Sequence, residues 1–196
     1  IEPFVSALKD PSPRIQVAAA VGLGRIGEVE AAQALLQVPV PSSFVTPKEG
    51  EEGPHATPNA SIVPAHIAVH SLVALDAIDA CVNAVGSAHN TIALWALGYM
   101  HDPKAVQGLI DKYHAVKNNE LKADILATLS RLYRKEVPYD GSWWWGTRPD
   151  TRGPYYNPTE WQGSPAIKDF LVAEWRKSTA SEKKLFAYLN GTHRMD

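Results

Sequence analysis

The sequence has one cysteine in 196 residues, and this scarcity excludes several kinds of site. Cys81 has no second cysteine in the chain, so no intrachain disulfide can form. Neither a Cys-x-x-Cys pair nor the Cys-x-x-Cys-His motif of covalent haem attachment is present. We therefore expect no cofactor within these residues. A low cysteine count suits either the cytosol or a bacterial periplasm and does not decide the compartment.

Charge of one sign and long apolar runs are also missing. The formal net charge is -2, and no block of like charges occurs, which argues against nucleic acid as a partner. No stretch of about 18 apolar residues is present, so we expect no membrane-spanning helix. The chain starts at Ile1 without a methionine or a leader, and we interpret it as a segment of a longer protein.

Motifs for catalysis are absent as well. The sequence contains no Gly-x-Ser-x-Gly elbow, no phosphate-binding loop and no His-Glu dipeptide. Cys81 stands between Ala80 and Val82 in an apolar helix and is expected to be a buried hydrophobe. Asp140 and Asp150 could form a carboxylate pair, but the sequence does not give their separation. We expect no catalysis from this segment.

One pair of histidines has the spacing of metal ligands. His66 and His70 are four residues apart, which places both imidazoles on one face of a helix. No acidic residue follows at ligand spacing before Asp76, so ordinary surface histidines are the favoured interpretation and a metal-dependent enzyme the weakest. His89, His101 and His114 lie near expected helix ends, where capping would explain them.

Apolar and small residues recur at helical spacing through the first part of the chain. Ser12 and Pro13 are typical of a helix start, and Gly24 and Gly27 are expected to end that helix before a second one at 28–36. The sequence therefore predicts two short helices joined by a tight turn.

The same pattern returns later in the chain. A shift of 74 residues aligns Leu23-Gly24-Arg25-Ile26 with Leu97-Gly98-Tyr99-Met100. Residues 74–81 form a tighter copy, and 121–134 a last one. Such repeats predict an all-α fold, a short α-solenoid of antiparallel helix pairs, because each pair buries its apolar face only against its neighbours.

The repeat resembles the HEAT-like repeats of phycobilisome-lyase-type proteins, through Ala96-Leu97-Gly98 and Asp102-Pro103-Lys104-Ala105-Val106-Gln107-Gly108-Leu109. This resemblance covers 1–136 except for an inserted loop at 38–64, which is rich in proline. A solvated excursion explains the insert best, and an arm that binds a partner is the alternative.

The segment 137–164 is dominated by aromatic residues. Three consecutive tryptophans fit neither helical nor strand periodicity, so we expect a loop. Its candidate binding residues are Trp143, Trp144, Trp145, Arg148, Asp150, Arg152, Tyr155, Tyr156 and Trp161. Packing of these rings on the solenoid end is the favoured interpretation. The alternative is a platform for sugar or polypeptide.

Two closing helices are predicted at 165–196. Pro165 opens the first, whose apolar face includes Ile167, Phe170, Leu171 and Trp175. Ser178 or Ser181 is expected to cap the second helix, which ends at Gly191. These helices would cover the end of the stack.

A narrower resemblance rests on Arg131-Leu132-Tyr133-Arg134-Lys135-Glu136, Tyr139-Asp140-Gly141 and the run from Trp144 to Tyr156. It is similar to the HEAT-repeat region of large secreted bacterial proteins that join dehydrogenase-like propellers to c-type cytochrome modules. The resemblance implies an exported, periplasmic or extracellular setting, with haem elsewhere in the parent chain. The sequence thus favours a non-catalytic scaffold whose partners are protein modules of the same chain or complex, with polysaccharide binding as the alternative.

Overall fold

The computed structural model describes residues 1–41, 62–137, 158–193 and 195. The described residues form an all-α array, as the sequence predicted. Its helices are α1 (Glu2–Ala7), α2 (Pro13–Ile26), the 3-10 turn η1 (Val29–Ala31), α3 (Ala32–Leu36), α4 (Val63–Ala74), α5 (Ile78–Ala84), α6 (Asn90–Leu97), α7 (Pro103–Ala115), α8 (Asn119–Leu132), α9 (Ser164–Lys177) and α10 (Ala180–His193).

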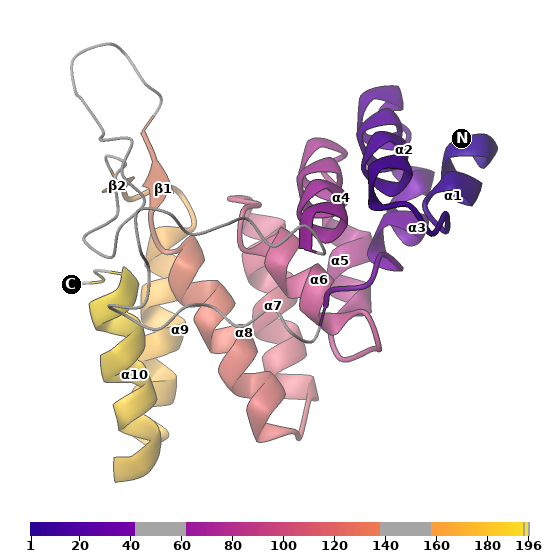
Figure 1. The fold of residues 1–196 in the computed structure, drawn as a ribbon. Coiled ribbons are helices and arrows are strands. Elements are labelled where there is room, and N and C mark those ends of the chain that lie inside the picture. Colours follow the sequence, from indigo (N-terminus) through magenta and orange to yellow (C-terminus); the bar gives the residue numbers. More distant parts are fainter. Residues whose placement is uncertain (42–61, 138–157, 194, 196) are drawn as a thin grey trace, which may run out of the picture.

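The helices form two layers that run the length of the molecule (Figure 1). In one layer α2, α4, α6, α8 and α10 pack in succession, and in the other α3, α5, α7 and α9 do. Each helix of the second layer also packs against the next helix of the first, as α5 does against α6. The chain termini lie at opposite ends of the array (Figure 1). This is the architecture of an α-solenoid.

Capping residues explain where several helices begin and end. Asp102 accepts a hydrogen bond from the backbone N–H of Lys104 at 2.7 Å, and Pro103 occupies the first turn of α7. Asn118 caps α8 in the same way through Leu121 N–H at 2.9 Å. Gly27 ends α2 in the left-handed region at φ 80°, which favours glycine. The Asp-Pro pair of the repeat is thus a helix start.

The 74-residue shift relates equivalent helix junctions. Gly24 of α2 lies against Ser71 of α4, where an added Cβ would come within 2.7 Å of the Ser71 Oγ. Gly98, its equivalent at the end of α6, lies against Arg131 of α8. Of the two glycines expected to end this helix, Gly27 does so and Gly24 does not, because α2 continues to Ile26. The small size of Gly24 instead lets two helices of one layer approach closely.

One continuous apolar core runs between the two layers. It includes the repeat leucines Leu23, Leu97 and Leu109, all fully buried. The start of the predicted insert is also anchored, since Val38 is buried. At its other end Pro64 lies in the first turn of α4. Residues 42–61, the middle of the insert, lie outside the described residues.

The two C-terminal helices extend the layers. α9 buries Ile167, Phe170 and Leu171, with the Phe170 ring edge-on to Tyr113 of α7. α10 packs against α8 and α9. The predicted caps of α10 are wrong. Thr179 N–H donates to the Glu182 carboxylate at 2.8 Å, and the Thr179 hydroxyl accepts from Glu182 N–H at 3.4 Å, which is a capping box. The helix also continues past Gly191 to His193.

Candidate functional site

Most of the aromatic segment lies outside the described residues. Positions 138–157 include Trp143, Trp144, Trp145, Arg148, Asp150, Arg152, Tyr155 and Tyr156, as well as Asp140. The sugar-platform hypothesis and the carboxylate pair therefore stay predictions. Of the nine candidate binding residues, the structure describes Trp161.

A short antiparallel ribbon flanks that segment. β1 (Lys135–Glu136) pairs with β2 (Pro158–Thr159), with Lys135 opposite Thr159 and Glu136 opposite Pro158. Figure 1 shows the ribbon beside the C-terminal end of α8 and the start of α9. The two ends of the aromatic segment are thus held together on the solenoid.

Trp161 faces the solenoid and anchors the chain just after β2 to it. Its indole Nε1–H donates to the carbonyl of Leu132, the last residue of α8, at 2.6 Å. Its ring lies edge-on to His101 with the ring centres 5.4 Å apart, and it also contacts Gly163. The single donor of the indole is used inside the fold. For Trp161 these contacts favour the packing interpretation over ligand binding.

Neighbouring polar groups complete the same junction. The Ser164 hydroxyl is buried, donates to the Tyr133 carbonyl at 2.6 Å and accepts from Trp161 N–H at 2.9 Å. The Tyr133 hydroxyl in turn donates to the Glu160 carboxylate at 2.9 Å. A network of hydrogen bonds therefore joins the end of α8 to the start of α9.

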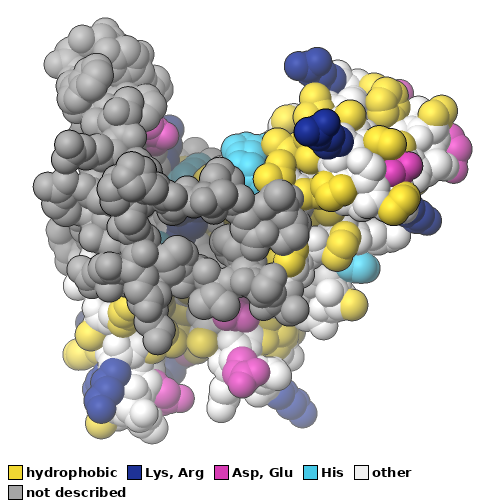
Figure 2. All heavy atoms as spheres, viewed as in Figure 1, with side chains coloured by type: hydrophobic (Ala, Val, Ile, Leu, Met, Phe, Trp, Pro, Cys, Tyr) yellow, Lys and Arg dark blue, Asp and Glu magenta, His cyan; other side chains and the backbone are white. Residues whose placement is uncertain are grey.

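The histidine pair on α4 has the geometry that its spacing predicted. The His66 and His70 Nε2 atoms are 3.1 Å apart, and both side chains are exposed. The His66 ring lies beside Trp95 of α6, with the ring centres 5.9 Å apart, and the His70 ring lies beside Tyr99, which follows that helix, at 6.3 Å. Burial, and then the charge of His70, lower the pKa of His66. Figure 2 shows histidine side chains gathered beside α4. The described residues hold no group of three or more potential ligands.

The remaining candidate groups are structural. The His101 ring bonds the Arg134 carbonyl, just beyond the C-terminal end of α8, at 2.9 Å. His89 stands at the N-cap of α6 but makes no side-chain cap bond. Cys81 is fully buried, and burial raises the pKa of its thiol to about 12, which leaves no thiolate near neutral pH.

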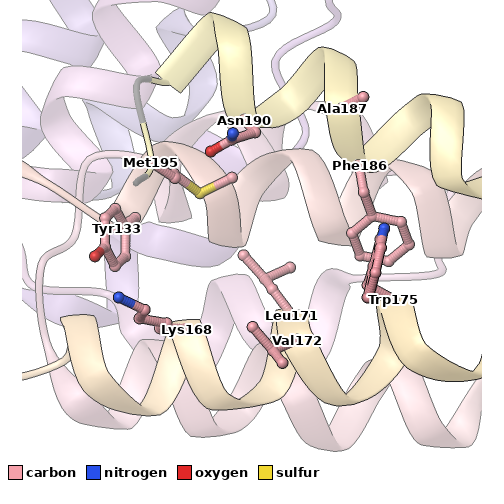
Figure 3. Close-up of a pocket in the computed structure, with 9 residues that line it drawn as sticks. All are labelled: Tyr133, Lys168, Leu171, Val172, Trp175, Phe186, Ala187, Asn190 and Met195. Atoms are coloured by element: carbon pink, nitrogen blue, oxygen red, sulfur yellow. The ribbon is translucent and has the colours of Figure 1, made fainter.

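Sequence reasoning missed an apolar groove between α9 and α10, which we call the C-terminal groove (Figure 3). Its cavity of about 250 Å³ is lined by residues that include Tyr133, Lys168, Leu171, Val172, Trp175 and Phe186. Trp175 was expected on the buried face of α9 but is 45% exposed. The signal was present as the spacing of Lys168, Val172 and Trp175, which forms a second stripe on α9.

Comparison with known families agrees with the geometry of the helix pairs. Residues 15–38, which span most of α2 and all of α3, match the model of the PBS lyase HEAT-like repeat. The chain contains a HEAT-like repeat. Repeats of this kind are typical of protein-interaction and scaffold modules. No curated protein matches the chain in sequence. Within the described ranges, no helix has the length and apolar character needed to cross a bilayer.

Proposed function

We propose that this chain is a non-catalytic protein-interaction module and that its C-terminal groove binds an amphipathic helix with acidic flanks. The observation that supports this proposal most directly is the exposed Trp175 beside a preformed apolar cavity at the end of a solenoid. Large aromatic side chains next to apolar pockets are typical anchors of protein interfaces.

The position of the groove indicates a helix as its occupant. Every earlier helix of the second layer has a successor in that layer, as α7 has in α9. Among the described helices α9 has none, and its outer stripe of Val172 and Trp175 stays exposed beside α10. A helix laid along this stripe would occupy the place of the next helix of the array, and helix-in-groove binding uses such i, i+3 and i+4 contacts.

The charged residues around the groove favour acidic residues at the edges of the bound helix. Lys168 lines one end of the groove, and the Lys183 ammonium lies 4.6 Å from the centre of the Trp175 ring at the other. Figure 3 shows Leu171 and Val172 between these ends and the Trp175 and Phe186 rings next to each other. Acidic residues flanking an apolar stripe would complement both lysines.

A designed peptide tests this proposal. We expect a fluorescent amphipathic helix with a Leu and Phe stripe and glutamate flanks to bind the protein, as measured by anisotropy. Binding should weaken at least tenfold in Val172→Asp and Trp175→Ala. A peptide with lysine in place of glutamate should bind more weakly. Tyr188→Ala is the matched control, because Tyr188 is 68% exposed and does not line the groove.

The same experiment can contradict the proposal. Thermal unfolding of each variant must first show an unchanged folded state, which we expect because both side chains are exposed. Equal binding by wild-type protein and Val172→Asp would exclude the groove as the site. No binding by either peptide would count against a helix as the occupant.

We also propose that the module belongs to an exported multidomain protein with dehydrogenase-like and cytochrome parts. Support for this setting comes from the resemblance of the aromatic segment described above. Fractionation of cells that produce the full-length protein is the test, and recovery of that protein in the cytosol without processing would contradict the setting.

A further inference from the structure

We propose that His66 and His70 form a two-histidine chelate for a divalent transition-metal ion, with Cu²⁺ bound most tightly. This inference does not depend on the C-terminal groove, which is formed by other helices. It rests on the distance between the two ring nitrogens, on the helix that holds them and on their exposure.

The separation of the two nitrogens fits a metal bound between them. With metal–nitrogen bonds of about 2.0–2.1 Å, two imidazole nitrogens lie roughly 2.9 Å apart at a right angle and about 3.4 Å apart at the tetrahedral angle. The observed Nε2–Nε2 distance of 3.1 Å falls between these values. The spacing of the two nitrogens is therefore that expected of two ligands of one ion.

The two rings are supported by rigid elements. The opposite face of α4 is buried in the core through residues that include Ala68, Val69 and Leu72. On the exposed side the aromatic rings of Trp95 and Tyr99 stand next to His66 and His70. Ligands held on a packed helix lose less conformational freedom when the metal binds. Both histidines are exposed, so an ion can reach them from solvent.

The chemistry of the donors decides which metals bind. Imidazole nitrogen favours Cu²⁺, Ni²⁺ and Zn²⁺ over Mg²⁺ and Ca²⁺, which prefer oxygen. The described residues provide no third side-chain ligand next to this pair. Affinity for such a simple site should follow the general order in which Cu²⁺ exceeds both Ni²⁺ and Zn²⁺.

A hydrogen bond between neutral rings is the competing explanation of the short contact. One imidazole would donate from Nε2 and the other accept, which also gives a nitrogen–nitrogen distance near 3 Å. Such a bond predicts no specific metal binding beyond that of single histidines. The two explanations therefore differ in stoichiometry and in the effect of removing one ring.

Calorimetric titration of the tag-free protein with CuCl₂, NiCl₂ and ZnCl₂ tests the proposal. We expect one ion per chain, with the tightest binding for Cu²⁺. His66→Ala and His70→Ala should each weaken binding at least tenfold. The matched controls His89→Ala and His114→Ala remove histidines that have no second histidine three or four residues away, and they should leave binding unchanged.

Thermal unfolding gives a second measurement. Because the chelate exists only when α4 is folded, metal should raise the melting temperature of the wild-type protein and of both controls, but not of His66→Ala or His70→Ala. Metal binding of equal strength in all variants would overturn the proposal. The absence of any binding below millimolar metal would overturn it as well.

Discussion

Two regions of the array differ in how closely their helices pack. One is the junction between α2 and α4, and the other is the end formed by α9 and α10. At the first, Gly24 lies directly against Ser71, and the Ser71 hydroxyl donates to the carbonyl of Ala20 at 2.8 Å. At the second, Trp175 and Phe186 stand beside an open cavity. Small residues let two backbones approach until no space remains, whereas large rings at the end of the array border an open cavity.

This difference separates residues that maintain the fold from residues available to a partner. Ala20 and Ser71 are buried, so neither can contact another protein. Trp175 and Val172 are exposed at the end and contribute little to the core. We expect substitutions at the first junction to change the free energy of unfolding, and substitutions at the groove to change binding.

The largest effect is expected for Gly24→Val. The new side chain would overlap Ser71, whose backbone is also close, so α2 and α4 must move apart at a cost of about 2 kcal/mol. The control is Gly191→Val in α10, where nothing lies within 4 Å of an added Cβ, and the change should be within about 0.5 kcal/mol. Urea unfolding measures both, and equal losses would remove the contrast between the two regions.

A smaller loss is expected for Trp161→Phe at the start of the C-terminal part. Phenylalanine leaves the Leu132 carbonyl without its indole donor and loses the contact of the distal indole ring with Gly163, which together should cost about 1–2 kcal/mol. Denaturant unfolding tests this value. An unchanged stability would show that this hydrogen bond between the end of α8 and the start of α9 does not hold the C-terminal helices to the array.

The smallest effect concerns pH and the end of α10. Burial, and then the charge of Arg131, lower the pKa of His193 to about 4 from an ordinary value of 6.5. The unfolded chain therefore binds a proton in this window that the folded chain does not, so stability falls as the pH drops from 6.5 towards 4. Because the ring is partly exposed, solvent screening should keep the loss below about 1 kcal/mol.

Unfolding of wild-type protein and His193→Gln between pH 5 and 6.5 measures this contribution. The slope of the free energy of unfolding against pH should be smaller in the variant but not zero, because the pKa values of His66 and His101 are lowered too. The raised pKa of Asp124, which faces the same cavity as His193, acts in the opposite direction nearer pH 4. Identical slopes in both proteins would show that the fold does not lower the pKa of His193.

Much of the fold could be predicted because its signals are local. The buried positions of α7 follow the spacing of Ala105, Val106 and Leu109, and its start follows from Asp102 and Pro103. The errors at Gly24 and Gly191 share one cause. A glycine within a helical pattern need not end the helix: Gly24 lies at a close approach to Ser71, whereas Gly191 has nothing within 4 Å of an added Cβ. Periodicity alone does not distinguish such glycines from one that ends a helix.

The two candidate sites differ in how far the sequence could predict them. The pairing of His66 with His70 follows from helical spacing, so the sequence was sufficient to find it. The groove depends on where α10 lies relative to α9, which is a contact between helices. The helical spacing of Trp175 is typical of a core residue. Its exposure depends on which helices lie next to α9, and among the described residues no further helix covers it.

The sequence by itself determined the helices, their repeat and the all-α class, since 3.6-residue periodicity and capping residues act over a few positions. The tertiary structure decided which faces of these helices are shared between layers. It directed Trp161 into the junction of α8 and α9 and left Trp175 exposed, because burial depends on neighbours that are distant along the chain.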